Sequence, residues 1–191
     1  MVMIPKIKVN IDGKTIEFDK GKTILQAANS TGIRIPTLCH DPRLEPFAAC
    51  RVCMVEVERG TSTALVTSCN TEIADGMVIR TDSEKVLKTR KMVLELILSD
   101  HPKDCMTCDK CGSCMLQDLA YEYSVRESRF FEEPDGGVTE DENPSIQHDT
   151  SKCILCGRCV RICAEVQQDY AIDFKNRGFE TQTGTPFGKP R

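Results

Sequence analysis

Twelve cysteines in a chain of 191 residues constrain this protein more than any other feature of its sequence. They fall into three groups, and Cys-x-x-Cys spacing recurs in each group. Hydrophobic residues make up 40% of the chain and aromatic residues only 5%, which is little for three separate apolar cores. We therefore expect that groups bound by the cysteines help to hold small domains together.

So many thiols have three common uses. Disulfides belong to oxidising compartments that are normally reached through a signal peptide, and residues 1–10 contain no apolar core followed by a small-residue cleavage site. Zinc sites use four ligands in compact pairs, and the spacings here differ from that arrangement. Repeated Cys-x-x-Cys loops favour metal ligation, so we expect iron–sulfur clusters, with a zinc scaffold and a disulfide framework as alternatives.

Charge and hydropathy narrow the range of partners. The longest apolar run, Val93–Leu98, is interrupted by Glu95 and is far too short to span a bilayer. The net charge of −4 argues against nucleic acid as a partner. We expect a cytoplasmic protein without membrane insertion.

Residues 1–80 are expected to form a small α+β domain. Alternating residues on both sides of Asp12-Gly13 are typical of a β-hairpin. Thr23 is placed to cap a short helix that Gly32 ends. Further short strands are expected at Val52–Val57, Leu65–Ser68 and Met77–Ile79.

Residues 81–131 are expected to be helical. Asp82 or Ser83 can cap a helix whose apolar residues recur close to the helical period and which ends at Ser99–Pro102. A cysteine loop follows, and a second helix is expected over Leu116–Arg129.

The remaining segments differ in composition. Residues 132–150 are rich in acidic residues and contain two prolines and a Gly-Gly pair, which predicts an exposed linker. Residues 151–191 form the third, cysteine-rich domain. Its tail, Gly178–Arg191, lacks periodicity and is expected to be loop.

The first cysteine group has the spacing C-x10-C-x2-C-x15-C. A [2Fe–2S] cluster needs four thiolates, two for each iron, gathered by a loop and a returning strand. The small, turn-rich loop Asp41–Ala49 would let backbone N–H groups face the sulfurs. We expect a [2Fe–2S] cluster rather than buried structural cysteines, with the ligands Cys39, Cys50, Cys53 and Cys69.

The second group contains five candidate ligands for one [4Fe–4S] cluster. His101, Cys105, Cys108 and Cys114 have the spacing H-x3-C-x2-C-x5-C, and Cys111 makes the loop a regular run of four cysteines that could replace the histidine. A neutral imidazole in place of a thiolate removes one negative charge, which should raise the reduction potential of the cluster.

The third group, Cys153, Cys156, Cys159 and Cys163, has the spacing of the bacterial ferredoxin run. In two-cluster ferredoxins the first three cysteines bind one cluster and the fourth binds the other, whereas this sequence holds one such run. Either Cys163 closes its own cluster, or a cysteine from a continuation of the chain or from a partner does so. We expect the outside cysteine, because Cys163 follows Cys159 by about one helical turn and should point away from the same cluster.

Segments from all three groups resemble one family. It is the N-terminal iron–sulfur region shared by the large iron–sulfur subunit of respiratory complex I, [FeFe]-hydrogenases, NAD(P)-linked formate dehydrogenases and the diaphorase small subunit of NAD-linked hydrogenases. The resemblance covers essentially the whole chain and is carried by Pro36–His40, His101–Cys105, Leu116–Tyr121 and Lys152–Arg161.

The resemblance implies an α+β protein with three domains. These are a β-grasp [2Fe–2S] domain, a small helical domain with a His/Cys3 [4Fe–4S] cluster and a partial ferredoxin-like [4Fe–4S] domain. The family's histidine motif matches His101, which leaves Cys111 as a non-ligand. The family commonly carries a second four-cysteine run after a stretch like Gly184–Gly188, and this sequence has no cysteine beyond that stretch.

The resemblance also implies the expected function. The chain is expected to relay single electrons between a flavin-containing NAD(P)H-binding subunit and a catalytic redox subunit or further iron–sulfur protein. Formate dehydrogenase, hydrogenase and electron-bifurcating transhydrogenase are the candidate enzymes. No Gly-x-Gly-x-x-Gly motif follows a strand and no paired base and nucleophile is apparent, so we expect no substrate chemistry in this chain. The alternative, an iron–sulfur redox-sensing regulator, lacks a basic recognition helix.

Overall fold

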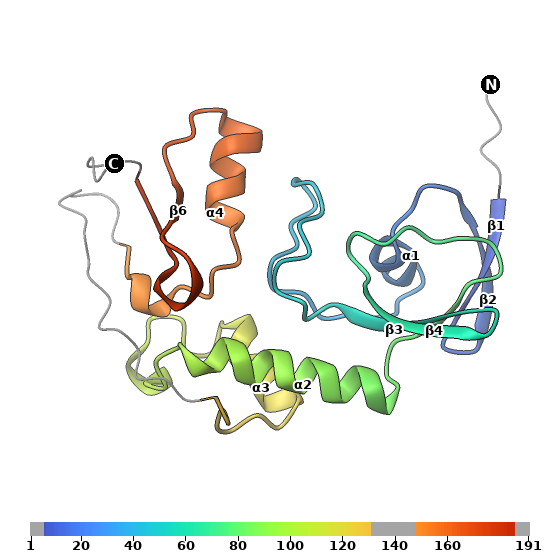
Figure 1. Cartoon of the computed structure of the whole chain (residues 1–191), viewed down its shortest axis with the longest axis horizontal. Helices are drawn as coiled ribbons and strands as arrows, with labels where there is room; N and C mark the ends of the chain where they lie inside the picture. Colours follow the sequence, from blue (N-terminus) through green and yellow to red (C-terminus); the bar gives the residue numbers. More distant parts are fainter. Residues whose placement is uncertain (1–5, 131–147, 186–191) are drawn as a thin grey trace. The chain divides into compact units, whose positions relative to one another are not determined.

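The computed structural model describes residues 6–130 and 148–185 (Figure 1). The chain divides into a first compact unit, Met1–Leu38 with Pro46–Val93, and a second one, Cys39–Glu45 with Leu94–Arg191. The expected acidic linker lies outside the described residues except for its last three positions. The division into three cluster domains with the boundaries given above stays a prediction.

The first unit begins with the expected hairpin. Strand β1 (Lys6–Ile11) pairs antiparallel with β2 (Lys14–Asp19), and Ile11 faces Lys14 across the turn. Asp12 and Gly13 both have positive φ, 50° and 85°, as a two-residue turn of the mirror-image type requires. The hairpin prediction is confirmed.

A five-stranded mixed sheet grows from this hairpin. Its order is β2-β1-β5-β3-β4, in which β1 and β5 (Val78–Arg80) run parallel and all other pairs are antiparallel. Strands β3 (Met54–Arg59) and β4 (Ser62–Thr67) form a second hairpin. These strands lie within a few residues of the expected ones.

Helix α1 (Ile24–Ser30) packs against this sheet. The Thr23 side chain accepts a hydrogen bond from the Gln26 N–H at 3.2 Å, and the Gln26 side chain accepts one from the Thr23 N–H at 2.9 Å. This reciprocal capping box fixes the start of the helix. A mixed sheet packed against one helix confirms the predicted α+β class and the predicted β-grasp fold of the first domain. The buried core joins helix and strands through Leu25, Ala28, Val9, Ile11, Val55 and Ile79.

Helix α2 (Glu84–Ser99) contains the boundary between the two units. The Ser83 hydroxyl accepts from the Val86 N–H at 3.3 Å, so Ser83 rather than Asp82 caps it. Glu95, which interrupts the apolar run in the sequence, is 4% exposed and pairs with Arg129 at 2.7 Å. No helix of the described ranges, α2 included, is long and apolar enough to cross a membrane.

Helix α3 (Met115–Glu122) begins within one residue of the helix expected over Leu116–Arg129, so a helix here is confirmed. It ends at Glu122, so the expected end at Arg129 was wrong. Ser124 adopts the left-handed conformation (φ 53°), and the Val125 N–H donates to the Ala120 carbonyl at 2.8 Å. This closure satisfies carbonyls at the end of the helix and turns the chain, while Val125 becomes buried.

The last part of the second unit combines short helices with a small hairpin. Strands β6 (Asp173–Lys175) and β7 (Gln182–Gly184) pair antiparallel, so the loop expected from Gly178 onward was wrong in its described part. Three-residue strands are too short to show a repeating pattern. The helical elements are η2 (Thr150–Lys152), α4 (Arg158–Arg161), η3 (Ile162–Gln167) and η4 (Gly178–Glu180).

Candidate metal centres

Three of the first four cysteines lie together in the first unit. Cys53 and Cys69 flank the β3–β4 hairpin at its open end, where the Ser68 N–H donates to the Cys53 carbonyl at 3.1 Å. Both are nearly fully buried, at 1% and 2% exposure, and Cys50 is half-buried. The turn that carries Cys50 has left-handed residues before and after it, Ala48 and Arg51, each with φ 56°. Such backbone conformations cluster at functional loops.

The Cys53 thiol is the most electrostatically perturbed of these three. Its pKa is lowered to about 6, chiefly by a hydrogen bond with the Cys69 side chain, while burial and the nearby Cys50 thiol oppose this shift. The thiolate, rather than the thiol, is the form that binds iron. The lowered pKa therefore favours Cys53 as a ligand.

Cys39, the fourth expected ligand of this group, is 2% exposed. It begins the segment Cys39–Glu45, which belongs to the second unit. Its ligation together with Cys50, Cys53 and Cys69 therefore stays a prediction.

His101 follows the end of α2, and its ring is oriented by the backbone. Nδ1 lies 2.8 Å from the Pro102 carbonyl oxygen. A carbonyl can only accept, so Nδ1 carries the hydrogen and the neutral ring has its lone pair on Nε2. This is the arrangement of metal-binding histidines, whose other nitrogen donates to a carbonyl or carboxylate.

The cysteines of the second group differ in exposure. Cys105 and Cys108 lie at the two ends of one short helical turn, in which the Cys108 N–H donates to the Cys105 carbonyl at 3.3 Å, and Cys114 directly precedes α3. These three are half-buried, whereas Cys111 is exposed. The difference favours His101 over Cys111 as the fourth ligand, and the ligand set itself stays a prediction.

Cys153, Cys156 and Cys159 lie within electrostatic reach of one another in the third group. The pKa of Cys159 is raised first by desolvation of its thiol and then by the neighbouring thiols of Cys153 and Cys156. Left-handed Leu155 (φ 51°) and Gly157 (φ 71°) form the turns between the three cysteines.

The Cys163 thiol has different partners. It is buried in η3 and donates to the Asp169 carboxylate at 2.5 Å, and it accepts the Ala171 N–H at 3.2 Å. The hydrogen bond from Cys163 is the first cause of the lowered pKa of Asp169. The Cys163 thiol is thus engaged by the segment that follows its own helix.

Three family models together match nearly the whole chain. Residues 5–84 match a 2Fe-2S iron-sulfur cluster binding domain, and residues 90–129 match the NADH-ubiquinone oxidoreductase-G iron-sulfur binding region. Residues 143–190 match the ferredoxin-like domain of NADH-quinone oxidoreductase subunit 3. The chain belongs to the iron–sulfur family that joins these domains. The resemblance found in the sequence is confirmed, and so is the expectation of [2Fe–2S] and [4Fe–4S] clusters.

Known members of this family are subunits of oxidoreductases. The NADP-reducing hydrogenase subunit HndD of Solidesulfovibrio fructosivorans is 44% identical over 95% of this chain and 32% of its own length. The 75 kDa subunit of NADH-ubiquinone oxidoreductase from Reclinomonas americana is 40% identical over 94% of this chain and 26% of its own length. This chain therefore spans only about a quarter to a third of these curated relatives.

A solved structure supports the same family. A chain of the NAD+-reducing [NiFe]-hydrogenase in its H2-reduced state superimposes with a TM-score of 0.80 at 29% identity. The match covers 93% of this chain and 74% of that one.

Two buried hydroxyls bear on whether the residues fit iron–sulfur clusters. Within the described ranges, the buried side-chain oxygens without a hydrogen-bond partner of normal geometry are those of Ser68 and Thr150, and the Ser68 side chain also helps to lower the pKa of the Cys53 thiol. Ser68 adjoins Cys69, and Thr150 lines a cavity of about 160 Å³ together with Cys153. Unpaired donors beside cysteines fit bound groups that offer sulfur acceptors.

No three Cys, His, Asp or Glu side chains of the described residues converge as they would around a single metal ion.

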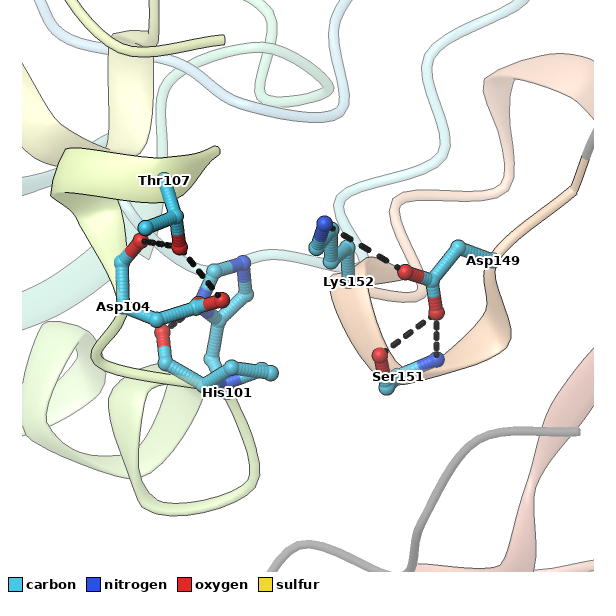
Figure 2. Close-up of polar contacts among 7 residues, drawn as sticks. His101, Asp104, Thr107, Asp149, Ser151 and Lys152 are labelled. Carbon is cyan, nitrogen blue, oxygen red and sulfur yellow. Dashed lines mark hydrogen bonds and ion pairs between the residues drawn. The ribbon is translucent and has the colours of Figure 1, made fainter. Parts of the chain in front are cut away.

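Lys152 places a positive charge among these thiols. Its Nζ lies 3.5 Å from the Asp149 carboxylate (Figure 2), and the hydrogen bond with Asp149 is the first cause of its raised pKa. The nearby Cys108 thiol and Asp104 raise that pKa further. A cation beside anionic ligands stabilises their charged form. Lys152 is not among the residues predicted from the sequence, although its place directly before Cys153 could have indicated such a role.

Proposed function

We propose that this chain relays single electrons between a flavin-containing NAD(P)H-oxidising partner and a distant redox site of a multi-subunit oxidoreductase. The observation that carries the proposal is the order of the cysteine groups along the chain. The three cysteine groups fall one to each of three matched iron–sulfur domains, in the same sequence along the chain.

The side chains of this protein bind the clusters and set their electrostatic surroundings. When bound, the clusters accept and release one electron at a time without forming or breaking bonds to a substrate. Neutral His101 lowers the negative charge of the middle ligand set, and Lys152 adds a positive charge nearby. Both features favour the reduced state and so favour uptake of an electron.

We propose three ligand sets. In each, thiolates or imidazole come from a loop adjoining a regular element, which limits the movement of the ligands. The sets are Cys39, Cys50, Cys53 and Cys69; His101, Cys105, Cys108 and Cys114; and Cys153, Cys156 and Cys159 with either Cys163 or an outside cysteine.

The relatives support the kind of complex but not the particular enzyme. Two of them are an NADP-reducing hydrogenase subunit and an NADH-ubiquinone oxidoreductase subunit. We propose a hydrogenase, formate dehydrogenase or electron-bifurcating transhydrogenase as the enzyme that this chain serves.

Anaerobic reconstitution tests the proposal. We expect brown protein with about 6 to 10 irons per chain, reducible by light-activated deazaflavin in one-electron steps. NADH should reduce the clusters only after a flavoprotein that co-purifies with the chain is added. Fewer than about two irons per chain with stoichiometric zinc, or oxidation of NADH by the chain alone, would overturn the proposal.

A further inference from the structure

Thr183 is a buried hydroxyl residue in contact with a proposed cluster ligand. It occupies the middle of β7, opposite Phe174 of β6, and is 2% exposed. Its Oγ1 lies 3.8 Å from the Cys153 sulfur and 3.2 Å from Nε2 of His148. The Thr183 hydroxyl therefore contacts two residues that lie 30 and 35 positions earlier in the sequence.

The Cys153 sulfur decides which atoms donate in the two hydrogen bonds of Thr183. A cysteine that binds iron is a thiolate and has no hydrogen to give, so the Thr183 hydroxyl must donate to it. The hydroxyl has a single hydrogen, so the contact with His148 requires Nε2–H to donate to the Thr183 oxygen. The hydrogen bonds then run one way, from His148 through Thr183 to Cys153.

Cys153 has a second donor. The Leu155 N–H lies 3.4 Å from the Cys153 sulfur and is aimed there by the left-handed conformation of Leu155. The backbone donor comes from the cysteine loop itself, whereas the hydroxyl donor comes from the β6–β7 hairpin.

Hydrogen bonds to a ligand sulfur affect the two redox states unequally. The reduced cluster carries one more negative charge, so a donor stabilises it more than the oxidised one and raises the reduction potential. We propose that Thr183, oriented by His148, donates a hydrogen bond to the Cys153 sulfur and raises the reduction potential of the cluster that Cys153 binds. This inference rests on the proposed function, because it requires Cys153 to be a ligand.

The test is a redox titration of reconstituted protein, followed by electron paramagnetic resonance. Thr183→Val keeps the shape of the side chain and removes the donor. We expect it to lower the equilibrium constant for reduction of one [4Fe–4S] cluster by about tenfold. The midpoint potential of that cluster's signal then falls by ~59 mV, the value for a one-electron couple. Thr183→Ser should restore the potential, and the other signals should not move.

A double-mutant cycle separates this role from a purely structural one. His148→Ala should lower the same potential in the wild-type background and should have no further effect in the Thr183→Val background. Thr181→Val is the matched control, because its hydroxyl lies in the same hairpin but donates to the Gly178 carbonyl at 2.7 Å.

The outcomes distinguish failure of the inference from failure of the proposed function. If Thr183→Val and wild type contain the same iron and have the same midpoint potentials, the inference is wrong. If Cys153→Ser leaves all cluster signals and the iron content unchanged, Cys153 is no ligand, and the proposed function fails at this site together with the inference.

Discussion

Arg161 and Glu165 form an ion pair one helical turn apart, with 2.8 Å between Nη2 and Oε1. Both side chains form hydrogen bonds with the backbone of Glu45. The Glu165 carboxylate accepts the Glu45 N–H at 3.0 Å, and Arg161 donates to the Glu45 carbonyl oxygen. Arg161 is only 8% exposed. The segment Cys39–Glu45, which begins with an expected cluster ligand, is thus anchored to α4, which contains Cys159, and to η3, which follows it.

Glu165→Gln should release this segment. The amide cannot pair with Arg161 as a carboxylate does, so the Glu45 N–H should open more often. We expect faster hydrogen–deuterium exchange over residues 39–45 and unchanged exchange in α1. Glu180→Gln, a change of the same kind at an exposed residue of η4, serves as the control. Equal exchange in wild type and Glu165→Gln would contradict the anchoring role.

The pH dependence of this anchor has a defined sign. The pKa of Glu165 is lowered, first by the hydrogen bond from the Glu45 N–H and also by Arg161. A carboxylate with a lowered folded pKa contributes stability above its unfolded pKa of about 4.3 and loses it as the pH falls through the folded value. The difference in unfolding temperature between wild type and Glu165→Gln should therefore be the same at pH 6 and pH 8. A difference that grows or shrinks between these two pH values would assign the effect to another group.

Arg90 supports the strand that follows Cys53. Its guanidinium donates to the Met54 carbonyl at 2.7 and 3.1 Å and is almost fully buried. Arg90→Leu leaves that carbonyl without these charged donors, which should cost roughly 2–3 kcal/mol in the free energy of unfolding. In urea the visible signal of the [2Fe–2S] cluster should disappear at a lower concentration. Lys88→Leu, at an exposed position of the same helix, should change the midpoint little.

How much the sequence predicts depends on how local each feature is. The Asp12-Gly13 hairpin and the Thr23 cap are fixed by residues a few positions apart, and both were predicted. The contacts of Arg161 with Glu45 and of Thr183 with Cys153 join residues 116 and 30 positions apart, which no local pattern encodes. The end of α3 was missed because Ser124 takes a left-handed conformation that glycine normally signals.

His101 and Cys111 compete for one position in the middle ligand set, and substitution separates them. The Pro102 carbonyl holds His101 with its lone pair on Nε2, while Cys111 is exposed. We expect Cys111→Ser to leave the paramagnetic signal of the middle cluster unchanged and His101→Ala to abolish or reshape it. His101→Cys should retain a cluster with a lower potential, because the thiolate adds a negative charge. The reverse pattern for the first two variants would establish a four-cysteine site.

Cys163 is the residue on which the third ligand set depends. Cys153, Cys156 and Cys159 influence one another electrostatically, whereas the Cys163 thiol contacts the Asp169 carboxylate and the Ala171 N–H. These two contacts orient the Cys163 thiol toward the segment that follows η3. Three thiolates bind three corners of a four-iron cluster, and the remaining iron would be labile without a fourth ligand.

We therefore expect a cysteine outside residues 1–191 to supply the fourth ligand. The isolated chain should assemble this cluster poorly or as a three-iron form, which iron analysis and electron paramagnetic resonance distinguish. Cys163→Ser should leave that form unchanged, while Cys159→Ser should abolish it. If the isolated chain holds a complete four-iron cluster here and Cys163→Ser alone destroys it, then Cys163 closes its own site and its contacts with Asp169 and Ala171 must break when the cluster binds.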